Sequence, residues 1–103
     1  MRRAGKVDRN QSSIVQCLRE EGCTVHSLAG VGHGMPDLLI GFGFLHTYLV
    51  EVKDGEKPKS AQSLTPDQER WISNWQGHPV VILRDVKQAR DWIRRMLGTA
   101  LDD

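Results

Sequence analysis

Hydrophobic residues recur along this chain at regular intervals, and the intervals predict where its helices lie. Ile14, Val15 and Leu18 are spaced three to four residues apart, as on one face of a helix. Gly22 is a typical residue just after a helix end, so we expect a helix from about residue 10 to residue 21. The polar residues that can cap its start are Asn10, Ser12 and Ser13.

Two further helices are expected in the second half of the chain. Thr65 has the pattern of a capping residue, Pro66 suits the first helical position, and Gln68 completes a capping box. The apolar face of this helix consists of Trp71, Ile72 and Trp75, and Gly77 ends it. Asp85 begins the last helix, which we expect to end at Gly98. Its apolar residues recur at three- and four-residue steps and are Val86, Ala89, Trp92, Ile93, Met96 and Leu97.

Short apolar runs between the helices predict four strands, at residues 23–28, 37–41, 47–52 and 80–83. The segment 41–44, Gly-Phe-Gly-Phe, is expected to be the turn of a hairpin between the second and third strands. The fourth run is wholly apolar, which is typical of an interior strand. We expect residues 54–63 to form a polar loop and residues 1–8 to form a flexible arm.

The resulting element order, α-β-β-β-α-β-α, predicts a mixed sheet flanked by helices in the α/β class. A chain of 103 residues is expected to form a single domain, residues 1–103. Charged residues make up 26% of the chain, which is normal for a folded protein. No apolar stretch reaches the roughly 18 residues of a membrane span. The N-terminus has no apolar signal segment, so the expected location is cytoplasmic.

The two cysteines, Cys17 and Cys23, follow no CxxC pattern and are expected to be free thiols. A zinc site with His26 and His33 would have a spacing that fits no common ligand pattern. The net charge is +1, but basic residues gather in short segments that are compatible with phosphate contacts. One such segment follows the third strand and includes Lys57 and Lys59, which we predict to be DNA-binding residues. Ordinary solvated surface charge is the alternative interpretation.

The end of the third predicted strand carries an unusual charge pattern. Side chains alternate along a strand, so Glu51 and Lys53 point to one face, about 6.5–7 Å apart. The hairpin can bring Asp37 beside Glu51, and two close carboxylates repel unless a cation lies between them. Oxygen ligands of this kind suit Mg²⁺ or Mn²⁺. The alternative is a surface ion pair between Glu51 and Lys53, with Pro36-Asp37 as a simple turn.

These residues carry a resemblance to a known nuclease superfamily. Pro36-Asp37, then thirteen residues, then Glu51-Val52-Lys53 resembles the PD-(D/E)xK signature, and the predicted element order is similar to that superfamily's core. Two further segments make the resemblance specific to one family within the superfamily. They are 34–39, Gly-Met-Pro-Asp-Leu-Leu, and 64–68, Leu-Thr-Pro-Asp-Gln. With them, the chain from about residue 10 to residue 92 resembles the stand-alone VRR-NUC nucleases of phages and prophages.

The resemblance implies a role for each matching residue. Asp37 and Glu51 would be metal ligands together with the backbone carbonyl of Val52. Lys53 would position or activate the attacking water and stabilise charge on the phosphate. Gln68 would reach toward the same site, cap its helix, or do both.

Two further positions are additional candidates for the site. Many relatives bring a glutamate from the first helix to the metal, and the corresponding position here is Gln11, whose amide oxygen can bind a metal but adds no negative charge. His33, in the glycine-rich loop before Pro36, is a candidate contact of the phosphate backbone or simply an exposed side chain.

The resemblance implies a metal-dependent DNA endonuclease that leaves 5′-phosphate and 3′-hydroxyl ends. We expect Mg²⁺ or Mn²⁺ as cofactor and branched DNA, such as a Holliday junction, as substrate. A homodimer is also expected, because the stripe of Trp71 and Trp75 together with Trp92 is a large aromatic surface for a small domain; the alternative is that all three indoles lie in the core. A phage or prophage protein would act in a bacterial cell. The alternatives are a non-catalytic DNA-binding module with the same fold and a purely structural phage protein.

Overall fold

The structure is a computed structural model and describes residues 7–102. Residues 1–6 of the expected flexible arm therefore lie outside the described part of the chain. The elements in chain order are α1 (Gln11–Glu20), β1 (Thr24–Ser27), β2 (Leu38–Phe42), β3 (His46–Val52), α2 (Lys59–Gln62), α3 (Pro66–Asn74), β4 (Val81–Leu83) and α4 (Val86–Asp102). The expected α/β class is confirmed.

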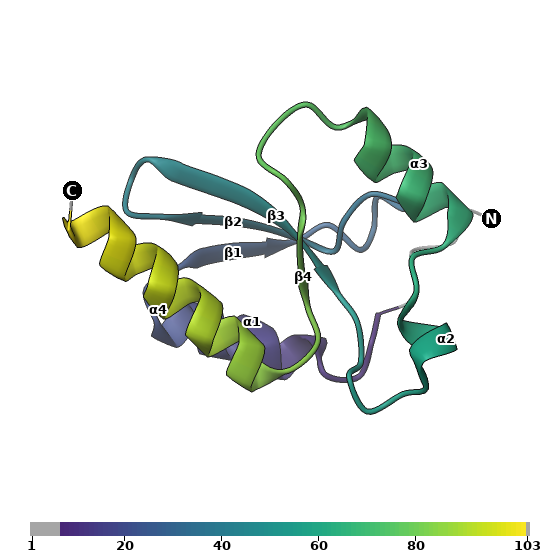
Figure 1. The fold of residues 1–103 in the computed structure, drawn as a ribbon, viewed down its shortest axis with the longest axis horizontal. Coiled ribbons are helices and arrows are strands. Elements are labelled where there is room, and N and C mark those ends of the chain that lie inside the picture. Colours follow the sequence, from purple (N-terminus) through teal and green to yellow (C-terminus); the bar gives the residue numbers. More distant parts are fainter. Residues whose placement is uncertain (1–6, 103) are drawn as a thin grey trace.

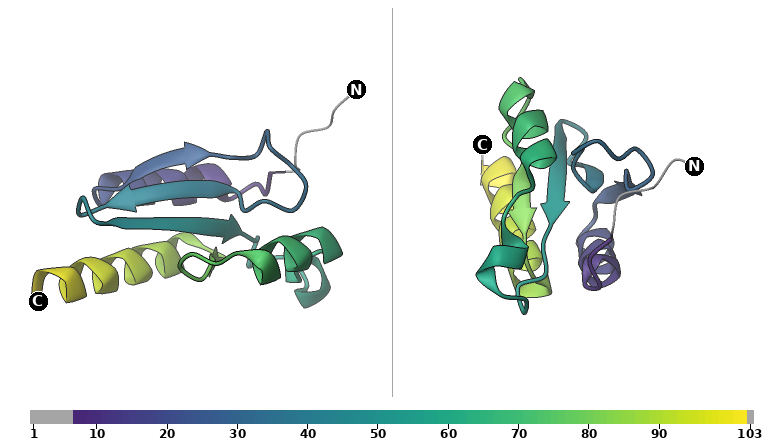
Figure 2. Two further views of the ribbon diagram at one scale, coloured as in Figure 1. Left: turned by 90° about the horizontal axis from the view of Figure 1, so that it is seen from above. Right: turned by 90° about the vertical axis from the view of Figure 1, so that its right-hand side faces the viewer.

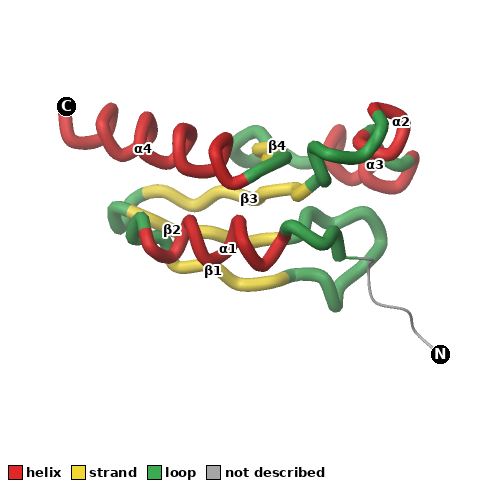
Figure 3. The backbone as a smooth tube through the Cα atoms, turned by 90° about the horizontal axis from the view of Figure 1, so that it is seen from below, coloured by secondary structure: helices red, strands yellow, loops and turns green. Residues whose placement is uncertain are grey.

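The four strands form one mixed sheet in the order β1-β2-β3-β4. The pairs β1–β2 and β2–β3 are antiparallel, and β3–β4 is parallel. Helix α1 lies over β1 and β2, and α4 runs beside β3 (Figure 3). Helices α2 and α3 lie beyond the C-terminal end of β3 (Figures 1 and 2).

The hydrophobic core lies between the sheet and the pair α1 and α4. Along β2 every second residue is buried, which is the pattern of a strand with one covered face. From α1 and α4 the core receives Ile14, Leu18, Ala89 and Ile93, and from the strands it receives Val25, Leu38, Ile40, Phe42, Val50, Val52 and Leu83. The side chains at positions 51 and 53 alternate with these and therefore point to the opposite face, away from α1 and α4.

Four expectations about element boundaries were wrong. Phe42 belongs to β2 rather than to the hairpin turn, because its ring packs edge-on against Trp92 with 5.9 Å between centroids. The predicted polar loop contains the one-turn helix α2. The fourth strand is an edge of the sheet, and its apolar residues are partly covered by α4. Helix α4 continues past Gly98 to Asp102.

The expectations about cysteines and tryptophans can be compared with the structure directly. Cys17 and Cys23 are free and buried, and burial raises the pKa of the Cys23 thiol to about 11. Trp92 lies in the core, whereas Trp71 and Trp75 stack on each other with 5.2 Å between ring centroids. Trp75 remains 43% exposed. Within residues 7–102, no helix is long and apolar enough to span a membrane.

Candidate active site

The β2–β3 hairpin brings the two predicted carboxylates together. Leu38 pairs with Val50, so Asp37, one residue before β2, lies opposite Glu51. The carboxylate of Asp37 accepts a 2.7 Å hydrogen bond from the backbone N–H of Val52, which fixes its position at the end of β3. Glu51 is only 2% exposed. The carboxyl groups of Asp37 and Glu51 are within hydrogen-bonding reach of each other.

Gln68 connects the lysine and the glutamate through its side-chain amide. Its Oε1 accepts a hydrogen bond from Nζ of Lys53 at 2.8 Å, and its Nε2 donates to Oε2 of Glu51 at 2.8 Å. The same Oε1 accepts from the backbone N–H of Thr65, while the Thr65 hydroxyl accepts from the backbone N–H of Gln68. Gln68 therefore completes the capping box of α3 and reaches the site in one conformation. Lys53 and Glu51 also form a buried ion pair at 3.5 Å.

Burial is the main cause that raises the pKa of both carboxyl groups, and nearby negative charge adds to the effect. Burial is the main cause for Glu51, whose pKa rises from 4.5 to about 8, and the neighbouring charge of Asp37 adds to the effect. The pKa of Asp37 is also raised by burial, although the Val52 N–H opposes the change. Lys53 partly offsets the repulsion for both groups. The two carboxyls therefore favour retaining a proton between them.

Two of the predicted ligand residues have a buried side-chain oxygen that lacks a hydrogen-bond partner. One is Oε1 of Glu51 and the other is Oε1 of Gln11, a residue of α1 that is 6% exposed. A buried acceptor without a donor is costly, so such atoms call for a ligand that supplies positive charge. The neighbouring carboxyl groups of Asp37 and Glu51 form a set of oxygen donors, which suits Mg²⁺ or Mn²⁺. This fits a divalent cation held by Asp37 and Glu51.

The Val52 carbonyl lies on the same side of β3 as this set. Within a strand the N–H and C=O of one residue point to the same edge. The N–H of Val52 is directed to Asp37, and its carbonyl is therefore directed to that side as well. Only two of the grouped donors are carboxylates, and no cluster of three or more His, Cys, Asp or Glu residues suited to a metal occurs in the described chain.

The remaining predicted site residues lie around this group. His33 is exposed and has a positive φ of 58°, between Gly32 and Gly34, which have φ values of 71° and 81°. The ammonium of Lys57 is 3.2 Å from a carboxylate oxygen of Asp8, so that part of its charge is already neutralised. Lys59 is exposed at the start of α2.

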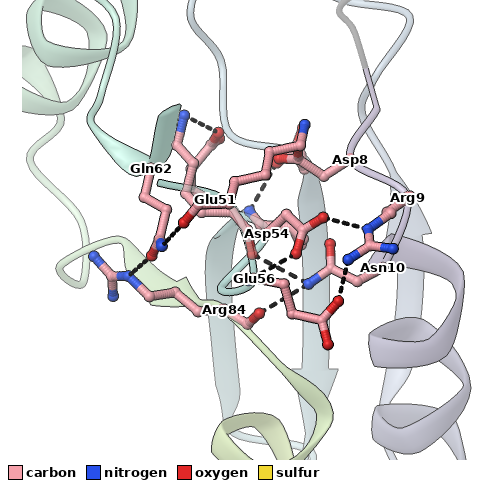
Figure 4. A network of polar contacts seen from close by, with 12 residues as sticks. Asp8, Arg9, Asn10, Glu51, Asp54, Glu56, Gln62 and Arg84 are labelled. Atoms are coloured by element: carbon pink, nitrogen blue, oxygen red, sulfur yellow. Dashed lines mark hydrogen bonds and ion pairs between the residues drawn. The ribbon is translucent and has the colours of Figure 1, made fainter. Parts of the chain in front are cut away.

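A second polar network, beside the first, was not foreseen from the sequence (Figure 4). Arg9 pairs with Asp54 and Glu56, and the Asn10 side chain donates to backbone carbonyls of Lys53 and Arg84. The Arg9 pairing lowers the pKa of Asp54. The sequence signal for this network is the polar segment before the first helix, whose pattern predicts a helix cap.

Gly34 allows the glycine-rich loop to pack closely against the first turn of α3. A Cβ atom on Gly34 would lie 2.3 Å from the backbone oxygen of Asp67 and 2.9 Å from the backbone nitrogen of Gln68. The glycine-rich loop thus packs directly on the first turn of α3, the turn that carries Gln68. Only glycine combines this close approach with the positive φ of the position.

Comparison with known proteins agrees with this geometry. The family model of the VRR-NUC domain, a family of PD-(D/E)xK-like nuclease domains, matches residues 3–86. Neither a curated protein nor a solved structure matches the chain. The family match covers most of the sequence and includes Asp37, Glu51, Lys53 and Gln68. The chain therefore belongs to the VRR-NUC family of nuclease domains.

Proposed function

We propose that this protein is a divalent-metal-dependent DNA endonuclease whose active site consists of Asp37, Glu51, Lys53 and Gln68. The observation that carries the proposal is the pair of adjacent carboxyls, a half-buried Asp37 and a buried Glu51 with an unpartnered oxygen, next to a buried lysine held by Gln68. Lysine and carboxylates buried together are costly to the fold unless they serve a bound ion or substrate. The family membership supports a nuclease activity for them.

The reaction adds water across a phosphodiester bond. The water oxygen forms a bond to phosphorus, the bond from phosphorus to the 3′ oxygen breaks, and that oxygen takes up a proton, which leaves a 5′-phosphate and a 3′-hydroxyl. A divalent cation held by Asp37, Glu51, Gln11 and the Val52 carbonyl would polarise the phosphate and lower the pKa of a bound water.

The protein's own groups supply orientation and charge. Lys53 donates hydrogen bonds to the attacking water and to the phosphate oxygen on which negative charge develops. Gln68 holds the Lys53 ammonium at 2.8 Å and keeps it from collapsing fully onto Glu51, which is 3.5 Å away. The N–H of Val52 holds the Asp37 carboxylate in place, so that no reorganisation is needed when the metal and DNA bind.

A cleavage assay tests the proposal. Supercoiled plasmid is incubated with the protein and Mg²⁺ or Mn²⁺, and with EDTA as the metal-free control. We expect metal-dependent cleavage that is lost in Asp37→Asn and Glu51→Gln, both of which keep side-chain size. Cleavage in EDTA, or cleavage by either variant at the wild-type rate, would overturn the assignment.

The preferred substrate in this proposal is branched DNA. A panel of labelled Holliday junctions, flaps, single strands and plain duplexes of equal length measures the preference as a ratio of single-turnover rates. Equal rates on all four would contradict structure specificity. Gln11 contributes no charge to the site, which favours as second candidate a DNA-binding module without turnover. That module would bind the junction in Ca²⁺ but would not cleave it in Mg²⁺ or Mn²⁺.

We also propose that the protein is a two-fold homodimer, since this is the commonest symmetry of soluble oligomers. The sheet face opposite α1 and α4 has an apolar pocket of about 200 Å³ whose lining includes Leu39, Leu49 and the half-exposed Trp75. We assign the dimer interface to this pocket and the exposed Trp75 indole. Light scattering is expected to give twice the chain mass, and Trp75→Lys is expected to lower it. A monomer mass at micromolar concentration would refute the dimer.

The cellular setting is also part of the proposal. Residues 1–103 would form one nuclease domain that acts in the cytoplasm of a bacterial host, encoded by a phage or prophage. Lys57 and Lys59 would contact the DNA backbone, and His33 would do so from the glycine-rich loop. Replacing each with alanine should weaken DNA binding in Ca²⁺ without changing the single-turnover rate at saturating protein, whereas wild-type affinity would exclude the contact.

A further inference from the structure

Asn10 is a capping residue that does not cap its helix. It occupies the N-cap position of α1, where an asparagine oxygen normally accepts a hydrogen bond from an N–H of the first turn. Here the side chain makes no capping hydrogen bond, and its Oδ1 is buried without a partner. Helix initiation therefore does not account for the orientation of this side chain.

The side chain is instead directed at the ends of two strands. Its Nδ2 donates to the backbone carbonyl of Lys53 at 3.1 Å and to that of Arg84 at 2.9 Å (Figure 4). The last backbone hydrogen bond of the β3–β4 ladder runs from Lys53 N–H to the Leu83 carbonyl, and Gly55 N–H then reaches the Arg84 carbonyl. The Asn10 amide therefore joins the two strands at the point where they separate.

The residues before Asn10 bind the same stretch of chain. Asp8 pairs with Lys57, and Arg9 pairs with Asp54 and Glu56. Three consecutive residues, 8–10, thus bond to residues 53–57, and we call these contacts the clasp. The next residue along the chain is Gln11, whose amide oxygen is also buried without a hydrogen-bond partner. The clasp therefore joins the start of α1 to the segment that begins with Lys53.

We propose that Asn10 is a positioning residue, which sets the backbone of Lys53 and, through the start of α1, the side chain of Gln11. The inference rests on the proposed function, because it assigns Asn10 to the alignment of that site. A displacement of about 1 Å at a catalytic group can reduce the rate about a hundredfold. Two hydrogen bonds from one rigid amide to adjacent carbonyls are a direct means to prevent such a displacement.

The test uses variants that are good helix caps but lack the amide donors. Serine and aspartate are about as favourable as asparagine at the N-cap, so Asn10→Ser and Asn10→Asp retain helix initiation. Neither the serine nor the aspartate side chain has the N–H groups that bind the two carbonyls. The aspartate would also place a negative charge against the carbonyl oxygens of Lys53 and Arg84. Ser13→Ala, an exposed change in the first turn of α1, is the matched control.

Two measurements are made on each variant below its unfolding temperature. We expect the single-turnover cleavage rate to fall by about 10- to 100-fold in Asn10→Ser and further in Asn10→Asp, with DNA affinity in Ca²⁺ within about twofold of wild type. In the metal-free protein, we expect the amides of Lys53 and Gly55 to exchange hydrogen at least about tenfold faster, with Ser13→Ala unchanged in both measurements. Wild-type hydrogen-exchange rates at these two amides would overturn the proposal. So would a wild-type cleavage rate in an Asn10 variant whose only change is a lower free energy of unfolding.

The two measurements separate this inference from the proposed function. If wild-type protein cleaves no DNA with any metal, the proposed function fails. Hydrogen exchange then still shows whether Asn10 holds the ends of β3 and β4. If wild-type protein cleaves DNA and Asn10→Ser cleaves it equally fast, the positioning role alone fails.

Discussion

Replacing Glu51 with glutamine is expected to stabilise the metal-free protein above neutral pH. Glu51 is buried beside Asp37, and one of its oxygens has no hydrogen-bond partner. A glutamine has nearly the same shape, keeps an oxygen to accept from Gln68, and removes the charge that the site disfavours. An amide can also donate a hydrogen bond to the Asp37 carboxylate, which a charged glutamate cannot do.

The pKa of Glu51 sets the size and the pH range of this effect. In the folded chain its pKa is raised to about 8, whereas the unfolded chain ionises near 4.5. Below pH 4.5, Glu51 does not change the free energy of unfolding. As pH rises from 4.5 to about 8, its ionisation in the unfolded chain lowers that free energy progressively, and above pH 8 the loss is constant. At about 1.4 kcal/mol per pKa unit the upper limit is about 5 kcal/mol. Asp37 and rearranging polar groups share the cost, so we expect a gain of ~2 kcal/mol for Glu51→Gln at pH 8.5.

Urea unfolding in EDTA at pH 5 and pH 8.5 measures this gain. Asp54→Asn is the matched control, because Asp54 is also buried but the Arg9 guanidinium lowers its pKa. A lowered pKa stabilises the fold above the unfolded pKa, so Asp54→Asn is expected to lose stability at pH 8.5. The reasoning is refuted if Glu51→Gln is less stable than wild type at pH 8.5, or if its gain is as large at pH 5.

Three further predictions concern the site and its supports. Lys53→Ala should reduce single-turnover cleavage about a hundredfold or more and leave DNA affinity in Ca²⁺ unchanged; weaker binding at an unchanged rate would exclude the assigned role. Gly34→Ala should lower the free energy of unfolding by about 2–4 kcal/mol in urea, because its Cβ would overlap the Asp67 carbonyl and its φ is positive. Gly30→Ala, which meets no atom within 4 Å, should stay within about 0.5 kcal/mol. Gln11→Glu should tighten Mg²⁺ binding in calorimetry and destabilise the protein in EDTA at pH 8.5; weaker binding would remove residue 11 from the metal ligands.

The arrangement of Asp37, Glu51 and Lys53 could be predicted because it depends on local geometry. Strand alternation places residues 51 and 53 on one face, and a short hairpin leaves little freedom for the residue opposite Glu51. The double role of Gln68 was also foreseeable, because a capping box fixes the first turn of α3 and thereby the direction of that side chain. Whether these residues act as assigned remains a prediction.

The errors have their origin in tertiary packing. Gly41 and Phe42 have the composition of a turn, yet Phe42 continues β2 because its ring is buried between the sheet and Trp92. The apolar run at 80–83 does not distinguish an interior strand from an edge strand that a helix covers. Asn10 is a favourable cap for any helix, so its pattern conceals the two long-range bonds that its side chain makes.

The proposed role of Gln11 as a metal ligand implies a compromise between metal binding and folding. The position is 6% exposed, and the other two proposed side-chain ligands, Asp37 and Glu51, already have raised pKa values. A third carboxylate there would add repulsion in a place where water cannot screen it, and the metal-free protein would carry that cost whenever it folds before binding metal. An amide keeps the oxygen that a hard cation requires and omits the charge. The proposed positioning role of Asn10 follows the same logic, because a neutral ligand with less attraction for the metal depends more on the backbone that holds it in place.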